Sequence, residues 1–332
     1  MKSLVLPPLS ALYGAVTRTR LALYQRGTFH TTKLDRPVIS VGNITAGGTG
    51  KTPLVEWVAR NVAGAGKNAC ILTRGYGREN PQRQVVVSDG KTILATPAEA
   101  GDEPFLLATK LLGSAAVICN ADRISAGRFA IETLGADCFV LDDGFQHLRL
   151  ARDLNIVTID ATNPWGGGQL LPYGRLREPV SNLSRADCVV LTRCDQAENL
   201  EALHAEIHAL IRGLPLFHST MKPVRSLLPS GPVAAFCAVG NATSFFRQLK
   251  ESDHEVVFEK SFTDHHAYTQ NDVDELIRAA TRAGATSLIT TAKDAVKLRS
   301  LHFSLPWHVF EIEILIEDEA ALTQLIKTAA GL

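Results

Sequence analysis

The segment Val38–Pro53 constrains the fold of this chain more than any other stretch. A short run rich in β-branched residues leads into a glycine-rich turn, and the apolar spacing from Leu54 onward predicts a helix. Backbone N–H groups of such a turn can surround phosphate oxygens, because glycine permits close approach and positive φ, and the helix adds its positive end. A lysine and a threonine at the helix start would supply a positive charge and a hydroxyl for Mg²⁺. The segment therefore predicts a nucleotide-phosphate site formed by Thr45, Gly47, Gly48, Thr49, Gly50, Lys51 and Thr52.

One position of this segment departs from the usual phosphate-loop pattern. The common form, Gly-x-x-x-x-Gly-Lys-[Ser/Thr], has glycine where this chain has Thr45. The first turn must therefore be made with a side chain present. A glycine-rich connection without a ligand is the alternative, and the ending Gly50-Lys51-Thr52 favours the phosphate site over it.

An acidic motif follows the apolar run Cys138–Leu141, where Asp142 and Asp143 stand at the expected end of a strand. A carboxylate delivered from the carboxyl edge of a sheet can hold Mg²⁺ beside a phosphate-binding loop. Because neighbouring side chains on a strand point to opposite sides, one carboxylate can face the metal while the other orients a neighbouring base. A pair of turn carboxylates without a ligand is the alternative, which the upstream loop disfavours.

The rest of the chain predicts an α/β fold. Apolar strands without alternation, as in a sheet covered on both faces, recur between helical segments such as Ala121–Leu134. Two short pieces, Gln84–Val87 and Thr92–Ala95, flank a turn at 88–90 and predict a β-hairpin. The fold class is therefore P-loop NTPase-like, with a mostly parallel sheet flanked by helices, and the expected strands include Ala69–Thr73, Ala116–Cys119, Cys138–Leu141, Asn155–Ile159 and Cys188–Thr192.

At 332 residues the chain is long for one hydrophobic core. Prolines cluster in 223–232, after which a second rhythm of strands and helices begins. We therefore predict a P-loop core at 36–225 and a smaller C-terminal α/β domain at 226–332. The tail, 308–332, with an expected strand at Val309–Ile316, is compatible with either unit. The expected strands of the smaller domain are Val233–Val239, Glu255–Phe258 and Ser287–Thr291.

Residues 1–35 form a separate N-terminal segment. Over the whole chain Lys+Arg and Asp+Glu are equal at 34 each, so no overall field argues for nucleic acid. No stretch is apolar for long enough to span a bilayer. Leu4–Tyr24, however, combines apolar side chains with Arg18, Arg20 and the following Arg26, which fits an amphipathic helix lying on a membrane surface. A helix packed on the protein's own core fits equally well.

If the chain is a kinase, a group must accept the proton of the acceptor hydroxyl. Asp102, with Glu103 beside it, precedes an expected helix and can face a cleft in that way; helix capping is the equal alternative. Asp264 and His265 form another candidate pair, in which His265 can share the proton and Asp264 can fix its tautomer. A surface Asp–His pair without function is the alternative there.

Arginines that can neutralise phosphate follow several expected strand ends. Arg74 and Arg78 flank a Gly-Tyr-Gly turn, and Arg123 follows another strand. The turn-rich stretch Ala161–Pro179 predicts a long loop, and long loops in compact enzymes usually serve function. These positions favour a basic cluster at the active edge of the sheet, to which the long loop adds Arg175 and Arg177, with Glu178 beside them.

The stretch Val189–Asp195 points to a different class of protein. It is similar to the strand and [Asn/Thr]-Lys-x-Asp element with which P-loop GTPases recognise guanine, with Arg193 in place of the lysine. A GTPase switch or a metal-insertion factor is therefore the alternative to a kinase. The arginine and the unusual Thr45 weaken it.

An ordered set of motifs is more specific than any one of them. Read together, the motifs resemble the tetraacyldisaccharide 4'-kinase family of lipid A biosynthesis, over about residues 12–316. That family carries Ser or Thr at the position of Thr45, which accounts for the departure from the usual pattern. The motifs are Gly42–Pro53, Thr73–Gly77, Ala100–Pro104, Asn120–Arg123, Leu141–His147, Leu176–Pro179 and Phe262–His265.

The resemblance implies an ATP- and Mg²⁺-dependent kinase. Its reaction would transfer the γ-phosphoryl group of ATP to the 4'-hydroxyl of a tetraacylated glucosamine disaccharide 1-phosphate. It further implies a peripheral protein on the cytoplasmic face of the bacterial inner membrane, acting on a lipid substrate at the membrane surface. This favours the membrane-surface interpretation of the N-terminal segment. We expect a monomer without an obligate protein partner and without nucleic acid.

The resemblance also assigns residues to roles. The acid–base pair maps onto Asp102 and His265, with Asp143 and Asp264 in support. Mg²⁺ would be bound by Thr52 and one of the two neighbouring aspartates, with Asp142 as the candidate. Contacts to substrate and phosphate are expected from Arg74, Tyr76, Glu103, Arg123, Gln146, Arg177 and Glu178.

Overall fold

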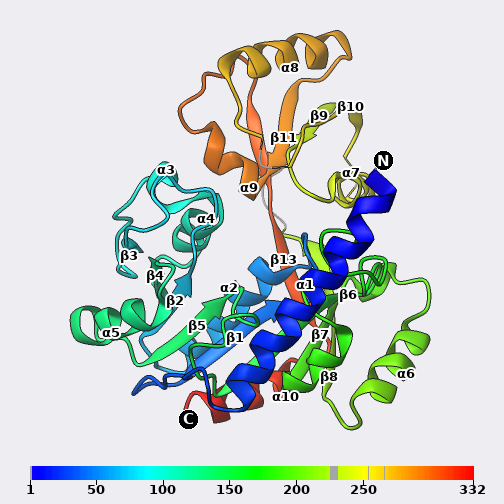
Figure 1. Ribbon diagram of the computed structural model, residues 1–332. Coiled ribbons are helices and arrows are strands. Elements are labelled where there is room, and N and C mark those ends of the chain that lie inside the picture. Colours follow the sequence, from blue (N-terminus) through cyan, green and yellow to red (C-terminus); the bar gives the residue numbers. More distant parts are fainter. Residues whose placement is uncertain (1, 225–230, 253, 265) are drawn as a thin grey trace.

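The structure is a computed structural model that describes residues 2–224, 231–252, 254–264 and 266–332 (Figure 1). Within these residues, nine strands form one large sheet and four form a smaller one. Helices cover the sheets, so the predicted α/β architecture is confirmed. The strands of the large sheet are β1 (Val38–Asn43), β2 (Ala69–Thr73), β3 (Val85–Ser88), β4 (Ala115–Cys119), β5 (Cys138–Asp142), β6 (Leu154–Asp160), β7 (Cys188–Thr192), β8 (Leu216–Pro223) and β13 (Ile312–Ile316).

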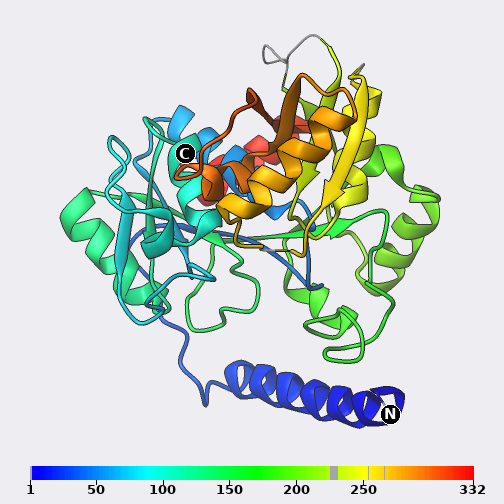
Figure 2. The ribbon, with the colours of Figure 1, turned by 90° about the horizontal axis from the view of Figure 1, so that it is seen from above.

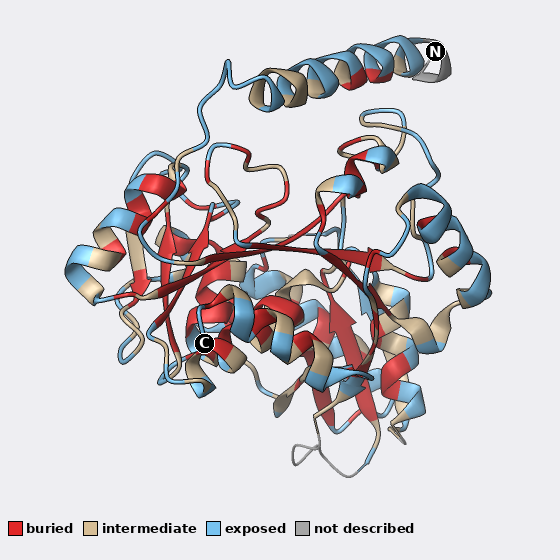
Figure 3. Cartoon of the chain, turned by 90° about the horizontal axis from the view of Figure 1, so that it is seen from below, coloured by how far each residue is buried: buried red, intermediate tan, exposed pale blue. Residues whose placement is uncertain are grey.

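The large sheet has the order β13-β8-β7-β6-β1-β5-β2-β4-β3. Its pairings are parallel except at the two edges, where β13 runs antiparallel to β8 and β3 antiparallel to β4. Parallel strands carry apolar side chains on both faces because helices cover both, and Figure 3 shows these strands as the buried centre of the molecule. The carboxyl ends of the central strands therefore meet along one edge of the sheet.

Helices cover the two faces of the large sheet in separate groups. Helices α2 (Lys51–Gly64), α4 (Asp102–Lys110) and α10 (Glu319–Ala329) share one apolar core with β1, β2 and β5. On the other face, α5 (Arg123–Leu134) packs over β2, β4 and β5, and α6 (Leu200–Leu210) packs over β6 and β7. Three short elements complete this part: α3 (Pro97–Ala100), η1 (Val180–Arg185) and η2 (Cys194–Gln196).

The smaller sheet is inserted between β8 and β13. Its order is β10-β9-β11-β12 and its pairings are parallel, with α7 packed on one face and α8 on the other. The chain leaves β8 beside the point where it returns to β13, since the Val224 N–H donates to the Glu311 carbonyl at 2.9 Å. The elements are β9 (Val233–Cys237), α7 (Ala242–Glu251), β10 (Val256–Ser261), α8 (Gln270–Arg282), β11 (Ser287–Thr291), α9 (Ala292–Ala295), η3 (Val296–Leu298) and β12 (Trp307–Phe310).

The N-terminal helix, α1 (Lys2–Gln25), extends along the outside of the molecule and is joined to β1 by an extended stretch (Figure 2). It contacts the long loop 161–179: the Ser10 hydroxyl donates to the Leu170 carbonyl at 2.8 Å, and the Tyr13 hydroxyl donates to the Arg177 carbonyl at 3.0 Å. In the part of the chain that the structure describes, no helix is both long and apolar enough to cross a membrane.

Two local predictions differ from the structure. The hairpin of Gln84–Val87 with Thr92–Ala95 is only partly formed: β3 pairs with β4, while an isolated antiparallel bridge between Ser88 and Ile93 and a hydrogen bond from the Leu94 N–H to the Val87 carbonyl at 2.8 Å join the two pieces. The Asp89 carboxylate accepts the N–H groups of Lys91 and Thr92, so a side-chain-capped turn replaces the tight hairpin turn. The single tail strand expected at 309–316 is two strands, with β12 in the smaller sheet and β13 in the large one.

Candidate active site

The phosphate-binding loop opens from β1, which lies between β5 and β6 in the large sheet. Gly47 and Gly50 have φ of 115° and 77°, values that L side chains rarely adopt. A Cβ at Gly50 would lie 2.8 Å from Cε of Met221 and 3.1 Å from Cγ2 of Thr192, so a side chain there would also require its neighbours to shift. Lys51 follows as the first residue of α2, which places its charge at the positive end of the helix.

Thr45 is accommodated because its position needs no left-handed backbone. Among the described residues other than glycine, only Asp143 and Arg193 have positive φ. Thr45 instead forms an antiparallel bridge with Leu176 of the long loop. The amide of Asn43 donates to the Thr45 carbonyl at 2.7 Å and to the Thr49 hydroxyl at 2.9 Å. The first turn of the loop is thus held by hydrogen bonds in place of a glycine.

Asp143 lies outside the strand, directly after the end of β5. Its φ of 54° turns its carboxylate toward the phosphate loop, where Oδ1 lies 3.5 Å from Nζ of Lys51. Arg177 donates two hydrogen bonds to the same carboxylate, at 2.7 and 2.9 Å. Burial by itself would raise the pKa of Asp143, but Lys51 and Arg177 outweigh it and hold the pKa at about 2. The expectation of two opposed side chains on one strand therefore needs correction, since a backbone turn separates the two carboxylates.

Asp142 ends β5 and is buried. Its Oδ2 accepts a hydrogen bond from the Thr73 hydroxyl at 2.8 Å. Burial, then the charges of Asp143 and Glu103, raise its pKa to about 6. A buried carboxylate beside other anions favours a bound cation, so the arrangement fits a Mg²⁺ ion held at this strand end.

Asp102 and Glu103 begin α4 at the same edge of the sheet. Gly101 precedes them with φ of 88°, and a Cβ there would lie 2.6 Å from the Tyr76 carbonyl oxygen. The loop after β2 therefore contacts the start of α4 through Tyr76, while Thr73 at the end of β2 contacts Asp142. These contacts bring Asp102 and the acidic end of β5 to one region.

The other predicted contact residues differ in how they are held. Arg123 is buried, and burial lowers its pKa while the charge of Asp142 opposes that shift. The Gln146 side chain donates to the Asn43 carbonyl at 2.8 Å. Glu178 is buried and accepts from Asn182 at 2.7 Å and from Arg185, so its carboxylate braces the long loop. In the loop after β2, Tyr76 is 77% exposed.

Some arginines bind backbone carbonyls. Arg78 is buried and donates to the Cys119 and Pro81 carbonyls, which ties the loop after β2 to β4. Arg175 donates to the Ala46 carbonyl at 2.9 Å and so supports the phosphate loop from the long-loop side. Arg74 lies close enough to Arg123 to lower the pKa of that guanidinium.

Of the predicted pair Asp264 and His265, the structure describes Asp264, which lies near the end of a strand of the smaller sheet. Asp264 follows β10 and lies beside Gly240, where a Cβ would be 3.2 Å from the Asp264 Oδ2. Both follow carboxyl ends of parallel strands, because Gly240 comes after β9. His265 lies outside the described residues.

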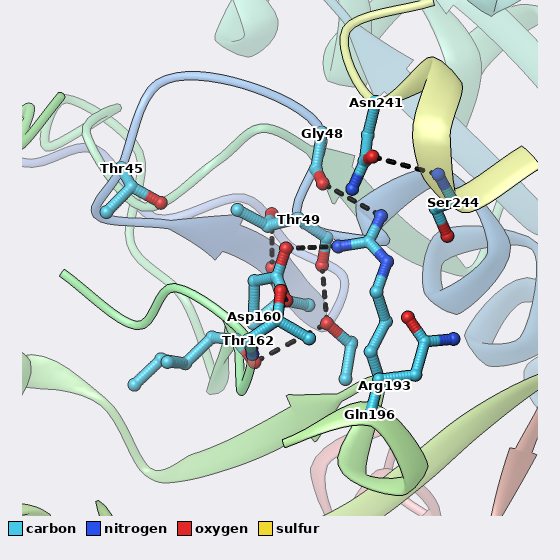
Figure 4. Close-up of polar contacts among 12 residues, drawn as sticks. Thr45, Gly48, Thr49, Asp160, Thr162, Arg193, Gln196, Asn241 and Ser244 are labelled. Carbon is cyan, nitrogen blue, oxygen red and sulfur yellow. Dashed lines mark hydrogen bonds and ion pairs between the residues drawn. The ribbon is translucent and has the colours of Figure 1, made fainter. Parts of the chain in front are cut away.

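The stretch that resembled a guanine-recognition element lies against the phosphate loop. Arg193, with φ of 57°, donates to the Asp160 carboxylate and, at 3.1 Å, to the Gly48 carbonyl (Figure 4). The Thr192 hydroxyl donates to the Thr49 carbonyl at 3.0 Å. The ends of β6 and β7 thus hold the loop from the side opposite Asp143. Sequence reasoning weighed Arg193 only as a base-recognition residue, and it missed Asp160, which is remote in the chain.

Comparison with known proteins gives a consistent result. The family model described as tetraacyldisaccharide-1-P 4'-kinase matches residues 2–330. A tetraacyldisaccharide 4'-kinase of Geobacter sulfurreducens is 44% identical over 322 residues, which cover 94% of this chain and 89% of the relative. One of Pelobacter propionicus is 40% identical over 331 residues, with 97% and 91% coverage.

A solved structure agrees over nearly the whole chain. It is the crystal structure of LpxK from Aquifex aeolicus, described as an "apo" form in complex with ATP, with a TM-score of 0.81 and 33% identity. The match covers 97% of this chain and 98% of that one, which confirms the P-loop NTPase-like fold class. The GTPase or metal-insertion alternative receives no support from these relatives. With the family model, the curated relatives and the solved structure in agreement, the chain belongs to the tetraacyldisaccharide-1-P 4'-kinase family.

Proposed function

We propose that this chain transfers the γ-phosphoryl group of ATP to the 4'-hydroxyl of a tetraacylated glucosamine disaccharide 1-phosphate, the step for which its family is named. The observation that carries the proposal is the 3.5 Å contact between Lys51 and Asp143, which joins the phosphate loop to the acidic end of β5. A phosphate-binding lysine beside a strand-end carboxylate pair is the arrangement that phosphoryl transfer requires.

The donor half of the site is the loop Gly47–Thr52. Its backbone N–H groups and the start of α2 surround the β- and γ-phosphates, and Lys51 adds a positive charge. Asp143 pairs with Lys51 from the other side, and Arg177 in turn holds the Asp143 carboxylate in place. Arg193 and Arg175 fix the carbonyls of the same loop, so the N–H groups keep their direction.

Thr52 and Asp142 are the residues that would hold Mg²⁺. Asp142 fits this role because its carboxylate is buried beside the charges of Asp143 and Glu103. Burial and these negative charges raise its pKa to about 6, and a bound cation would offset both effects. When bound, Mg²⁺ supplies positive charge to the phosphate oxygens. The hydrogen bond from Thr73 fixes the Asp142 carboxylate at the strand end.

The acceptor half centres on Asp102. As the acceptor oxygen forms its bond to the γ-phosphorus and the bond from that phosphorus to the bridging oxygen breaks, Asp102 takes the hydroxyl proton. In this proposal His265 shares that proton, and Asp264 orients the imidazole. Contacts to the sugar and to phosphate come from Arg74, Tyr76, Glu103, Arg123, Gln146 and Arg177, while Glu178 acts through the long loop that it braces.

The proposal places the protein on the cytoplasmic face of the bacterial inner membrane. It is supported by α1, whose side chains Val5, Leu9, Leu12 and Val16 are all exposed. These positions recur at helical spacing, so they form one apolar face of the helix. A lipid substrate also requires access from a membrane surface. We propose a peripheral monomer that meets its substrate there.

The direct test is to incubate the pure protein with ATP, Mg²⁺ and the detergent-dispersed tetraacyl disaccharide 1-phosphate. A bisphosphorylated lipid is the expected product, and ATP should compete for nucleotide binding where GTP does not. Asp102→Asn should lower kcat about a hundredfold or more while ATP binding persists, because the base is lost and the loop is intact. Asp274→Asn on α8 is the matched control. Absence of lipid product contradicts the substrate, and normal turnover by Asp102→Asn contradicts the base.

A further inference from the structure

Lys297 is a largely buried lysine in η3, with a side chain only 8% exposed. Its Nζ lies 3.7 Å from Oδ2 of Asp102 and 3.5 Å from Oδ1 of Asp294. The ring centroid of Tyr268 is 5.9 Å from the same nitrogen. Asp102 begins α4, a helix packed on the large sheet. Lys297, Asp294 and Tyr268 belong to the part of the chain that contains the smaller sheet. The ammonium group therefore links the two parts of the molecule.

A buried ammonium group is costly unless its partners are well placed. Asp294 provides such a partner, because its side chain has no exposed area and its position is fixed. Its other oxygen, Oδ2, accepts from the Ala238 N–H at 3.0 Å and from the Thr291 hydroxyl at 2.7 Å. These bonds attach Asp294 to the carboxyl ends of β9 and β11. Lys297 is consequently held at one end by a carboxylate that cannot move independently of the smaller sheet.

The second carboxylate paired with Lys297 is that of Asp102. One ammonium charge can pair with both Asp294 and Asp102, and each carboxylate lowers the cost of burying it. An ion pair of this kind restricts the orientation of the carboxylate. A general base acts more efficiently when its orientation is already restricted before the reaction. Glu103 has a separate partner, since Nζ of Lys293 lies 2.9 Å from its Oε1.

We propose that Lys297 is a positioning residue for Asp102: anchored by Asp294, it aims the Asp102 carboxylate from the smaller sheet toward the phosphate-binding loop. The inference rests on the proposed role of Asp102 as the base. Lys297 touches neither substrate nor nucleotide in this proposal. It makes the orientation of the base depend on how the smaller sheet lies against α4.

A general docking role would also explain a salt bridge here, so the test needs a matched contact. Arg299 supplies it, because its guanidinium carbon lies 4.8 Å from the ring centroid of Phe105 on α4. Arg299→Met removes a contact between the same two regions without touching Asp102. Lys297→Met removes the ammonium group and keeps most of the apolar stem.

The experiment measures kcat, the KM for ATP and thermal stability for Lys297→Met, Lys297→Arg and Arg299→Met, with the full chain and the dispersed lipid substrate. For Lys297→Met we expect kcat to fall on the order of tenfold while the KM for ATP stays within about twofold, because orientation is lost and the loop is not. Lys297→Arg should recover part of kcat. Arg299→Met should keep kcat near that of the parent.

Asp102→Asn separates this inference from the proposed function. If Asp102→Asn itself keeps normal turnover, the base assignment fails. If Asp102→Asn is inactive but Lys297→Met is normal, only the positioning role fails. The double variant Asp102→Asn, Lys297→Met should lose no more than Asp102→Asn alone, because the two residues act as a unit.

Equal losses in Lys297→Met and Arg299→Met would also overturn the positioning role, since they would indicate docking alone. Should Lys297→Met fail to fold, Asp294→Asn provides the second test. That change keeps an oxygen acceptor for Ala238 and Thr291 but removes the charge that anchors Lys297. It should lower kcat with little change in the KM for ATP, and unchanged turnover would contradict the inference.

Discussion

At the scale of the residue, two identical neighbouring side chains acquire opposite properties. Asp142 is buried at a strand end with a pKa raised to about 6, whereas two cations hold the pKa of Asp143 at about 2. The left-handed backbone of Asp143 causes the difference, because it turns that carboxylate toward Lys51 and Arg177. One backbone angle therefore separates a carboxylate paired with cations from one that lacks sufficient positive charge.

His147 shows a second effect of local charge. Burial, followed by the charges of Arg123, Arg152 and Arg149, lowers its pKa to about 4 from the ordinary value of 6.5. Between these values the unfolded chain binds a proton that the folded protein excludes. The contribution of His147 to the free energy of unfolding is therefore complete above about pH 6.5 and is lost as pH falls toward 4.

We expect His147→Gln to weaken the loss of stability on acidification. Between pH 7.5 and pH 5.5 the parent protein should lose about 1 kcal/mol more than the variant, because glutamine takes up no proton in the unfolded chain. Urea unfolding at the two pH values measures the difference. His30→Gln, at an exposed position, is the control. An identical pH dependence for His147→Gln and the parent would contradict the assignment.

At the scale of the element, α1 has two faces with an unusual distribution of side chains. Its small and polar residues face inward: Ser10 and Tyr13 bond to the long loop, and a Cβ at Gly14 would lie 2.6 Å from a methyl carbon of Leu170. The apolar residues face solvent, with Leu12 62% and Val16 58% exposed. The sequence left two interpretations of α1 open: a helix on a membrane surface and a helix packed on the protein's own core. Packing on the core leaves the apolar face of α1 exposed, so the membrane-surface interpretation is the one that gives this face a role.

We expect the double change Leu12→Glu, Val16→Glu to reduce binding to vesicles of anionic phospholipid at least about tenfold, because it places two charges on the apolar face. Co-sedimentation measures the binding. Turnover of detergent-dispersed substrate should change little, since both side chains are mostly exposed. Leu210→Glu on α6 removes another exposed leucine and should bind as the parent does. Undiminished sedimentation of the double variant would contradict a membrane role for this face.

At the scale of the whole molecule, the carboxyl edges of the two sheets face each other. Salt bridges join Lys293 and Lys297 of the smaller part to the start of α4, and Arg247 of α7 donates to Gln196 beside Arg193. Figure 1 shows the smaller sheet standing over this edge of the large sheet. Arg193 also donates to the Gly48 carbonyl, so the contact region borders the phosphate loop, and we expect both parts of the molecule to position a nucleotide bound there.

Nucleotide binding should therefore stabilise the protein as a unit. With ADP and Mg²⁺ at about a hundred times Kd, the gain of about 2.7 kcal/mol should raise Tm by roughly 4 °C for a chain of this size. Lys51→Met should abolish most of the rise, because the phosphates lose their lysine. Lys327→Met, at an exposed position on α10, should retain it. A full rise in Lys51→Met would place the nucleotide elsewhere.

Features that depend on residues close together in the chain could be predicted from the sequence. The strand, glycine-rich loop and helix around Lys51 follow from local spacing, and the strand-end aspartates follow from an apolar run of strand length. The ordered motifs determined the family, because no single motif is as specific as their order. The hairpin at 84–95 is only partly formed, because its first strand pairs mainly with the distant β4, and the local pattern cannot choose between the two partners.

Which of the predicted site residues contact one another became known from the three-dimensional structure. The pairing of Asp102 with Lys297, the brace of Arg193 on the phosphate loop and the outward apolar face of α1 all join segments remote in sequence. Such contacts leave no periodic pattern in the sequence. The residues around each partner fit a solvent-exposed side chain as well as a paired one. The phosphate loop can therefore be predicted from local sequence. The charged groups that hold the loop, and those that orient the proposed base, come together only in the folded chain.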